Sequence, residues 1–509
     1  MSDNVGSLTR ITKYLANNNT QMPDIMAEAD WLQYIASYGD LIRAFGPDAA
    51  AGERHYQQHG RAEGRSLDKF DERQYLANYA DLRAAYGSNL QAGIRHFIVF
   101  GYFEGRTDRA LRPNIVLFLV DDLGYGEAGA TSQADTVTPG IDAIATAGVV
   151  ATSGYVTAPL CAPSRTGVLT GQYQQHFGIY DNPPPEGSTA RWNGGLPATA
   201  TTIAERMRAV GYATGKIGKW HVGFRPDQHP MRRGFDEFFG VIGSDHPYYG
   251  EMPGNPVLRG FTPEPQTEYL TGVFAREAVS FIRRHHAQPF FLYLPFTAIH
   301  VPLQATPEKL AQFHVIANPR RRTVAAMLGS LDDAVGAVTQ ALREQGVADR
   351  TLIVFMGDNG CGPCKNSPLR AGKGTFYEGG LRVPFIVSWP GVLQGGTRSD
   401  IPVSSLDLSA TFLAAAGTSP ASLDGRNLIG ALRGGNAPHA CLYWRGKGQG
   451  AIRCGDWKLI DNGARPLELY DLQTDPGETR NVASTNATVV TRLRQEQIEW
   501  QRTLAPRTW

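Results

Sequence analysis

The sequence predicts an α/β protein with a mostly parallel central sheet flanked by helices, preceded by a helical N-terminal repeat module. Three observations support this prediction. A block of 41 residues occurs twice near the start of the chain, apolar runs rich in β-branched residues recur through the middle, and helical stretches separate those runs. A chain of 509 residues has room for more than one domain and a large core. The expected divisions are an arm over 1–26, two repeats over 27–108, the α/β domain over 111–435 and a final part over 436–509.

The repeat module is the first element. The segment 34–41 recurs at 75–82 and the segment 60–65 recurs at 101–106, without a gap between them. Such units normally stack to bury a shared face, and these two are expected to be short helices closed by glycine turns. Histidines stand at equivalent positions of both units, and packing is a better interpretation of them than a metal site. We expect the module to serve targeting or assembly, including formation of a homo-oligomer.

The α/β domain is predicted from its apolar runs, such as the continuous one within 112–120, which is rich in β-branched residues. Helical stretches such as 201–210 lie between the runs. Strands that alternate with helices imply a largely parallel sheet covered on both faces. The predicted strands lie near 114–120, 212–217, 290–294, 351–356 and 385–388.

Acidic residues directly follow two of these strands. Asp121 and Asp122 follow the first strand, and Asp358 and Asn359 come shortly after the fourth. Open α/β sheets bind their ligands at the carboxyl ends of their strands. Either pair alone is also common loop chemistry. Together their oxygen atoms suit a hard divalent cation, calcium with magnesium or manganese as alternatives, and they do not suit zinc or copper.

The segment Cys161-Ala-Pro-Ser-Arg165, followed by Leu169-Thr-Gly171, is the most informative motif. A single cysteine is usually a small buried hydrophobe. The whole pattern, however, resembles the modification signature of type I sulfatases, which are formylglycine-dependent, arylsulfatase-like members of the alkaline phosphatase superfamily. The resemblance implies that a formylglycine-generating enzyme oxidises Cys161 to an aldehyde whose hydrate is the nucleophile, and that Arg165 holds the hydrate. A thiolate is a poor ligand for a hard cation, which agrees with conversion to an oxygen group.

Three further blocks match the same family in the same order. Lys219 and His221 lie in Gly-Lys-Trp-His-Val-Gly, His300 follows a predicted strand, and Lys373 precedes Glu-Gly-Gly-Leu-Arg-Val-Pro. The resemblance implies that both lysines contact the sulfate, that His221 bonds the hydrate and that His300 faces the ester oxygen. Taken singly, each would be interpreted as an ordinary polar residue. The metal ligands that the resemblance implies are Asp121, Asp122, Cys161 as formylglycine, Asp358 and Asn359.

The implied function is hydrolysis of sulfate monoesters to an alcohol and inorganic sulfate. The lysines and the cation would stabilise the sulfonyl oxygens. His300 or Lys373 would protonate the departing alcohol, and His221 or Asp358 would accept the proton whose loss expels sulfate. The closest alternative is a phosphonate or phosphodiester hydrolase with the same nucleophile. A binding protein on a decayed scaffold is the alternative outside enzymes, yet all the polar positions of the family pattern are filled.

The resemblance covers about four fifths of the chain. It also implies that residues 436–509 form a small antiparallel subdomain like the one at the carboxyl terminus of other sulfatases. The identity of the alcohol is left open, and we expect the loops over 244–249 and 361–370 to select it.

The remaining cysteines require separate treatment. Cys361-Gly-Pro-Cys364 matches the thioredoxin redox motif, and such a pair can also begin a zinc site. The residues after it predict a loop instead of the helix that redox chemistry needs, and no second pair stands at zinc spacing. We expect a loop element beside the active site that forms a local disulfide under oxidising conditions. Cys441 and Cys454 remain unassigned.

Composition narrows the function classes. A net charge of +1 gives no basic field for nucleic acid, and no apolar stretch is long enough to span a membrane. The first ten residues lack the basic and apolar regions of a secretory signal. The simplest expectation is a cytoplasmic enzyme, with export by a route without a cleaved N-terminal signal as the alternative.

Overall fold

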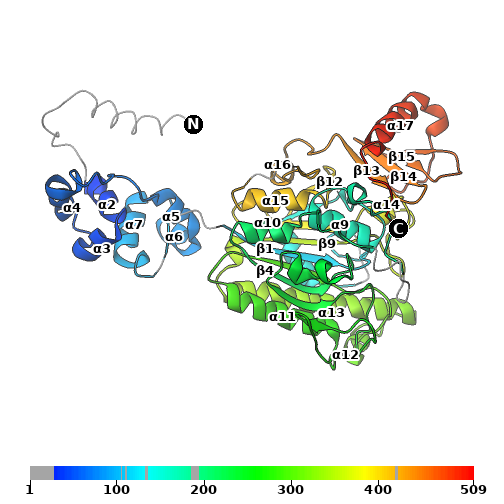
Figure 1. Ribbon diagram of the computed structural model, residues 1–509, viewed down its shortest axis with the longest axis horizontal. Coiled ribbons are helices and arrows are strands. Elements are labelled where there is room, and N and C mark those ends of the chain that lie inside the picture. Colours follow the sequence, from blue (N-terminus) through cyan, green and yellow to red (C-terminus); the bar gives the residue numbers. More distant parts are fainter. Residues whose placement is uncertain are drawn as a thin grey trace. The chain divides into compact units, whose positions relative to one another are not determined.

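The computed structural model describes residues 28–104, 106–108, 112–131, 136–184, 194–418 and 422–508. The expected arm over 1–26 therefore lies outside the described residues. The chain forms two compact units that divide between Leu111 and Arg112. Figure 1 labels the elements of both units.

The first unit consists of two equivalent helical repeats. Each repeat has three short α-helices and ends in a π-helical turn. One hydrophobic cluster contains residues of both repeats, among them Leu32, Ile35, Leu76 and Ile98, so the two repeats bury a shared face. The elements are α2 (Glu28–Ala36), α3 (Gly39–Phe45), α4 (Ala49–His55), η1 (Tyr56–Gly60), α5 (Glu72–Asn78), α6 (Ala80–Tyr86), α7 (Leu90–His96) and η2 (Phe97–Gly101).

Recurring polar residues have the same partners in both repeats. The Tyr34 hydroxyl lies 3.0 Å from Nδ1 of His55, and the Tyr75 hydroxyl lies 2.8 Å from Nδ1 of His96. Both tyrosines are buried, and a buried hydroxyl needs a hydrogen-bond partner. The repeated histidines therefore have a structural role, in agreement with their interpretation from the sequence as packing residues.

The second unit is built on a ten-stranded sheet in the order β11-β2-β10-β9-β1-β8-β4-β5-β6-β7. Its five central strands, β9 to β5 in that order, run parallel. The strands are β1 (Asn114–Val120), β2 (Val149–Ala151), β4 (Ala213–Lys219), β5 (Glu237–Val241), β6 (Leu258–Arg259), β7 (Thr262–Pro263), β8 (Phe290–Phe296), β9 (Thr351–Gly357), β10 (Phe385–Ser388) and β11 (Thr397–Ser399).

All five predicted strands are present, with bounds within two residues of the prediction at the start and end of each. The predicted run 385–388 is β10, which pairs antiparallel with both β9 and β2. The outer strands β2, β6, β7 and β11 and the last of the central strands, β5, are short and were not predicted individually. A two-stranded pair, β3 (Gly154–Tyr155) with β12 (Val403–Ser404), lies outside the large sheet.

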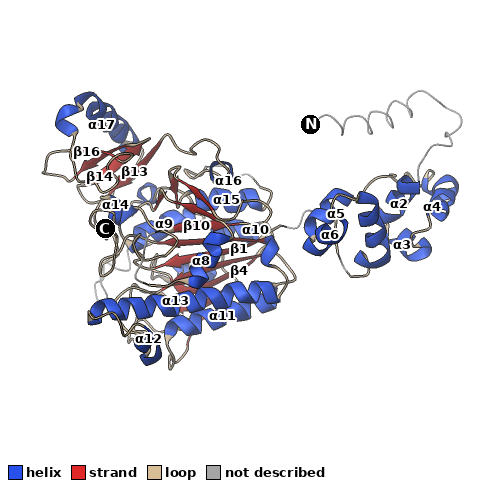
Figure 2. Ribbon diagram, turned by 180° about the vertical axis from the view of Figure 1, so that it is seen from behind, coloured by secondary structure: helices blue, strands red, loops and turns tan. Residues whose placement is uncertain are grey.

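Helices cover both faces of the sheet, as Figures 1 and 2 show from opposite sides. Alternate residues of β1 point to opposite faces. Val116 and Phe118 pack in one core with residues of α8, α11 and α13, whereas Ile115 and Leu117 pack in the other with residues of α9, α10 and α15. The helices are α8 (Pro139–Thr146), α9 (Cys161–Thr170), α10 (Ile203–Ala209), α11 (Leu270–His285), α12 (Pro307–Gln312), α13 (Pro319–Glu344), α14 (Glu378–Leu381), α15 (Asp407–Ala415) and α16 (Ile429–Leu432).

The end of the chain forms the small antiparallel sheet that the resemblance implied. A last helix, α17 (Ala487–Gln501), packs on it. Cys441 and Cys454 are directly opposite in register on β13 and β14 and form a disulfide. Among the described residues, no helix has both the length and the apolarity needed to cross a bilayer. The strands are β13 (Cys441–Arg445), β14 (Gly450–Cys454), β15 (Trp457–Asp461) and β16 (Glu468–Asp471).

Candidate active site

The parallel strands bring both acidic pairs to one edge of the sheet. Because β1 and β9 are paired in parallel, Asp121 and Asp358 follow the strands at the same edge. The backbone N–H of Asp122 donates to Oδ1 of Asp358 at 3.0 Å, and the amide of Asn359 donates to Oδ1 of Asp122 at 2.8 Å. Asp122 adopts a left-handed backbone conformation with φ of 58°, which turns the chain directly after the strand. The predicted acidic residues therefore form one cluster.

Cys161 and Arg165 enter this cluster from α9. Cys161 is the first residue of the helix, and Arg165 lies four positions later, so both side chains are on one helix face. The Cys161 thiol lies 3.5 Å from Oδ1 of Asp121. The Arg165 guanidinium is fully buried. Its Nε donates to Oδ2 of Asp358 at 2.9 Å, and its Nη2 forms an ion pair with the same oxygen at 2.8 Å. The helix thus positions the modification motif against the acidic cluster.

Two lysines complete the set of charges. Lys219 is the last residue of β4, and its Nζ lies 2.5 Å from Oδ2 of Asp121. The Nζ of Lys373 lies 2.7 Å from Oδ1 of Asp122. Both predicted sulfate-contacting lysines therefore lie in the acidic cluster and pair with its carboxylates.

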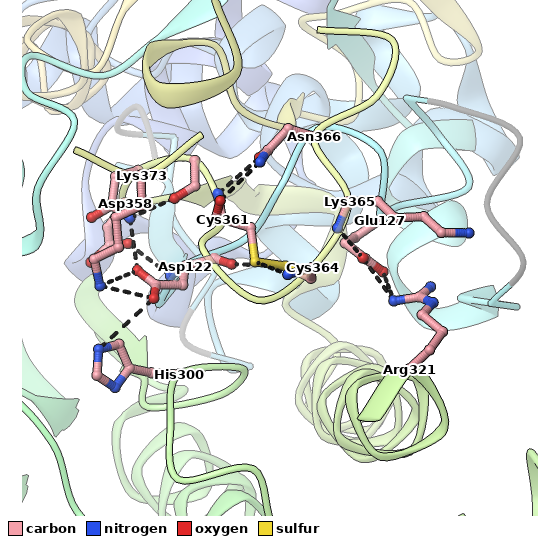
Figure 3. The surroundings of a disulfide bond; sticks show 12 residues. Asp122, Glu127, His300, Arg321, Asp358, Cys361, Cys364, Lys365, Asn366 and Lys373 are labelled. Atoms are coloured by element: carbon pink, nitrogen blue, oxygen red, sulfur yellow. Dashed lines mark hydrogen bonds and ion pairs between the residues drawn. A yellow bond between two sulfur atoms is a disulfide. The ribbon is translucent and has the colours of Figure 1, made fainter. Parts of the chain in front are cut away.

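The two predicted histidines lie in the same region. The Nε2 atom of His300 lies 3.8 Å from Oδ2 of Asp122 (Figure 3). His221 follows Lys219 by two residues and is buried, with a left-handed φ of 63°, and no described group hydrogen-bonds its Nδ1. Burial lowers the pKa of both histidines below the ordinary value, and the positive charge of Lys219 lowers it further while Asp121 opposes the shift.

The donor chemistry fits a hard cation. Ligand atoms of Asp121, Asp122, Cys161 and His300 all lie within 4.8 Å of one another. The Asn359 amide donates through Nδ2, while its Oδ1 is buried and has no hydrogen-bond partner among the described residues. A buried acceptor without a donor is costly and indicates a partner of another kind. Three carboxylates and this amide oxygen form the ligand type that calcium and magnesium prefer.

Burial and charge set the protonation of the site. Burial would raise the pKa of Asp121, but Lys219, His300 and Arg165 together hold it below its ordinary value. Burial raises the pKa of Asp358 to about 6 against the opposing charge of Arg165. Burial, with only partial opposition from Lys219, also raises the pKa of the Cys161 thiol. An unmodified Cys161 is therefore a protonated thiol and a weak nucleophile.

Two residues support the site in ways that the sequence motifs do not predict. The Tyr248 hydroxyl is buried and donates to the carbonyl oxygens of Thr297 and His300 at 2.7 and 3.0 Å. Tyr248 lies in the loop expected to select the alcohol, but its hydroxyl fixes the backbone that carries His300. The Asn182 side chain accepts from the backbone N–H of Ala162, next to Cys161, at 3.0 Å. Neither residue lies near a recognisable motif.

Known proteins match both parts of the α/β unit. The Sulfatase family model matches residues 113–418, and a model described as N-sulphoglucosamine sulphohydrolase, C-terminal, matches residues 372–503. N-acetylgalactosamine-6-sulfatase of Mus musculus is 32% identical over 418 residues, which cover 76% of this chain and 78% of the relative. Arylsulfatase A of Homo sapiens is 33% identical and covers 76% of this chain and 87% of its own length. The crystal structure of Ps i-CgsB is 36% identical with a TM-score of 0.75 and covers 78% of this chain and 94% of that one.

The buried ion pair of Arg165 gives the first testable prediction. Arg165→Ala should lower the free energy of unfolding of the α/β unit by roughly 3–5 kcal/mol, because it leaves Asp358 buried without its cationic partner. Urea titration followed by tryptophan fluorescence measures the change. The control is Arg208→Ala, which removes an exposed ion pair with Asp236 and should cost less than about 1 kcal/mol. Equal losses in the two variants would contradict the interpretation.

Proposed function

As a member of the type I sulfatase family, this chain is a sulfuric ester hydrolase, and we propose that its nucleophile is the hydrate of a formylglycine formed from Cys161. The observation that carries the proposal is the position of Cys161, at the start of α9 with its Sγ 3.5 Å from Asp121. The raised pKa of the thiol supports it, because the unmodified side chain is a poor nucleophile. Maturation then requires a formylglycine-generating enzyme.

Each polar residue of the site has a role in this proposal. Arg165 holds the hydrate against the carboxylates, and Lys219 and Lys373 stabilise the sulfonyl oxygens while one hydroxyl attacks sulfur. His300 or Lys373 donates the proton that the departing alcohol needs. His221 or Asp358 accepts the proton of the second hydroxyl, and this proton loss expels sulfate and restores the aldehyde. A serine nucleophile has no second hydroxyl for that elimination.

We also propose a divalent cation at the acidic cluster. Asp121, Asp122, Asp358 and Asn359, with an oxygen of the modified Cys161, would hold it, and the unpartnered Oδ1 of Asn359 supports this assignment. Calcium is the preferred ion for such a donor set, with magnesium or manganese as alternatives. When bound, the cation polarises the sulfonyl oxygens of the ester.

The substrate proposed is a sulfated carbohydrate. Ps i-CgsB, which is 36% identical to this chain, has also been solved in complex with k-i-k-neocarrahexaose. N-acetylgalactosamine-6-sulfatase, among the curated relatives, acts by its name on an amino-sugar sulfate. Both relatives support a sugar hydroxyl as the alcohol, although Arylsulfatase A is equally similar in sequence.

The repeats and the compartment are separate proposals. We propose that the repeat module serves assembly or targeting, including homo-oligomer formation. We further propose export by a route without a cleaved N-terminal signal in place of the cytoplasm. The disulfides Cys361–Cys364 and Cys441–Cys454 support export, because disulfides persist mainly in oxidising compartments.

Removal of the nucleophile tests the mechanism. Cys161→Ala should fold with an unchanged thermal midpoint but lose turnover, since it removes a small side chain and leaves the sheet intact. Peptide mass and hydrazine trapping should detect the aldehyde in wild-type protein made in a host that oxidises the motif. Full activity of protein with an unmodified Cys161 would refute the mechanism.

The balance of charges in the site favours a sulfate ester over a phosphate ester. The site pairs three carboxylates with three cationic side chains, Arg165, Lys219 and Lys373. Only the bound cation would then be left to balance additional negative charge on a substrate. A phosphate monoester carries about one more negative charge than a sulfate monoester, its second pKa being about 6.

We therefore expect a higher kcat/KM for 4-nitrophenyl sulfate than for the matching phosphate monoester or phosphonate. The comparison uses calcium-loaded, aldehyde-bearing enzyme, with a chelator-treated sample as the inactive control. A carbohydrate sulfate in the same series tests the proposed alcohol. A phosphonate or phosphodiester preferred by about tenfold would favour the alternative hydrolase with the same nucleophile.

Deletion of the repeats tests their role. A protein that lacks residues 1–108 should retain kcat and KM for a sulfate ester, because the site residues and the two large hydrophobic clusters that position them belong to the second unit. The oligomeric state, measured by light scattering, should differ from that of the full chain. Loss of all turnover by a correctly folded truncation would contradict this separation of roles.

A further inference from the structure

The Cys361–Cys364 disulfide lies beside the acidic cluster of the active site, between that cluster and the Glu127–Arg321 ion pair (Figure 3). Cys361 follows Asn359 by two residues, and Lys373 comes later in the same loop. The residues from 358 to 373 therefore carry both a proposed cation ligand and a proposed sulfate-binding lysine. The disulfide cross-links the segment that joins these groups. Neither cysteine has a role in the proposed mechanism.

One side of the disulfide contacts the loop that follows β1. The Sγ of Cys364 lies 3.4 Å from the carbonyl oxygen of Asp122. The next residue, Lys365, accepts from the backbone N–H of Gly126 at 3.1 Å and donates its own N–H to Glu127 at 2.7 Å. The Glu127 carboxylate is fully buried and accepts from Arg321 of α13 at 2.8 and 2.9 Å. The disulfide loop is thus fastened to the segment that carries Asp122.

The other side contacts the segment that carries Lys373. The carbonyl oxygen of Cys361 accepts from the backbone N–H of Lys373 at 3.2 Å. The Asn366 side chain bonds the N–H and the carbonyl of Cys361, each at 2.8 Å. A Cβ on Gly372 would lie 2.3 Å from the Cys361 carbonyl oxygen, so the two segments are in close contact. Movement of Cys361 would therefore move the backbone of Lys373.

We propose that the Cys361–Cys364 disulfide is a positioning element that fixes Lys373 and Asp122 relative to each other. This inference rests on the proposed function of that pair. The cross-link closes a short loop, so it restricts few states of the unfolded chain and contributes mainly to local order. Catalytic groups must be held to within a fraction of an ångström, and displacement by about 1 Å can cost about a hundredfold in rate. Activity should therefore depend on this disulfide more than global stability does.

The variant that tests the proposal is Cys361→Ser combined with Cys364→Ser. We expect kcat for a sulfate ester to fall by about tenfold or more, with KM changed by less than about threefold. The loss should be larger for a carbohydrate sulfate than for 4-nitrophenyl sulfate, because the poorer leaving group needs the donated proton more. Activity is normalised to the aldehyde content at Cys161.

The matched control is Cys441→Ser combined with Cys454→Ser. That disulfide joins β13 to β14 and closes a longer loop, so its removal should lower the thermal midpoint more and kcat less. A kcat of the Cys361/Cys364 variant within about twofold of the wild type would overturn the proposal. So would equal kcat losses in the two double variants.

Amide hydrogen exchange gives a readout that does not depend on turnover. In the Cys361/Cys364 variant, exchange should rise in peptides covering 121–127 and 366–376, and the control variant should leave both unchanged. A rise in exchange confined to residues 361–366 would show that the disulfide orders only its own loop, and would overturn the proposal. If the oxidised, aldehyde-bearing wild type does not hydrolyse sulfate esters, the proposed function fails while this comparison still tests the disulfide.

Reduction of the wild type covers the case in which the double variant does not fold. A water-soluble phosphine reduces the disulfide to two thiols and takes up oxygen from water as phosphine oxide, without adding a thiol to the aldehyde. Activity should fall on reduction and return on reoxidation, with both disulfides followed by peptide mass. Full activity after reduction of Cys361–Cys364 would overturn the proposal.

Discussion

Each buried carboxylate of the active site has a cationic side chain against it. Asp121 pairs with Lys219, Asp122 with Lys373 and Asp358 with Arg165. Carboxylates this close together repel one another, and burial has removed their hydration. A paired cationic side chain offsets both costs. The three cationic residues come from the end of β4, from the loop after β9 and from α9. The need to bring these segments to one edge of the sheet therefore constrains the fold around it.

The same pairing connects stability with chemistry. Arg165 contributes to stability by balancing Asp358, and in the proposed mechanism it also holds the hydrate. The lysines balance the carboxylates in this structure and, in the proposed mechanism, stabilise the sulfonyl oxygens. Removal of any one of these charges should affect both folding and catalysis. Measurements that separate the two effects are therefore more informative than activity alone.

The sequence predicted the central part of this arrangement because two local signals coincide there. Continuous apolar runs identify β1 and β9, and the polar residues at their ends belong to motifs of fixed spacing. The short outer strands lack such runs, and the antiparallel direction of β10 depends on the path of the chain between elements. The Cys441–Cys454 disulfide follows from strand register, which sequence spacing does not reveal. Tyr248, Asn182 and Arg321 act through contacts with distant segments and carry no local pattern.

The burial of α9 has a consequence for biosynthesis. All ten residues of the helix, Cys161 included, are buried in the folded unit. An enzyme that oxidises the Cys161 side chain needs to reach it directly, and the folded sheet and helices deny that access. In the proposed pathway, modification must therefore precede completion of the fold, while the motif is still an extended segment of a newly made chain. A molecule that folds first would remain inactive until it unfolds again. The active fraction would therefore depend on the rate of modification relative to the rate of folding.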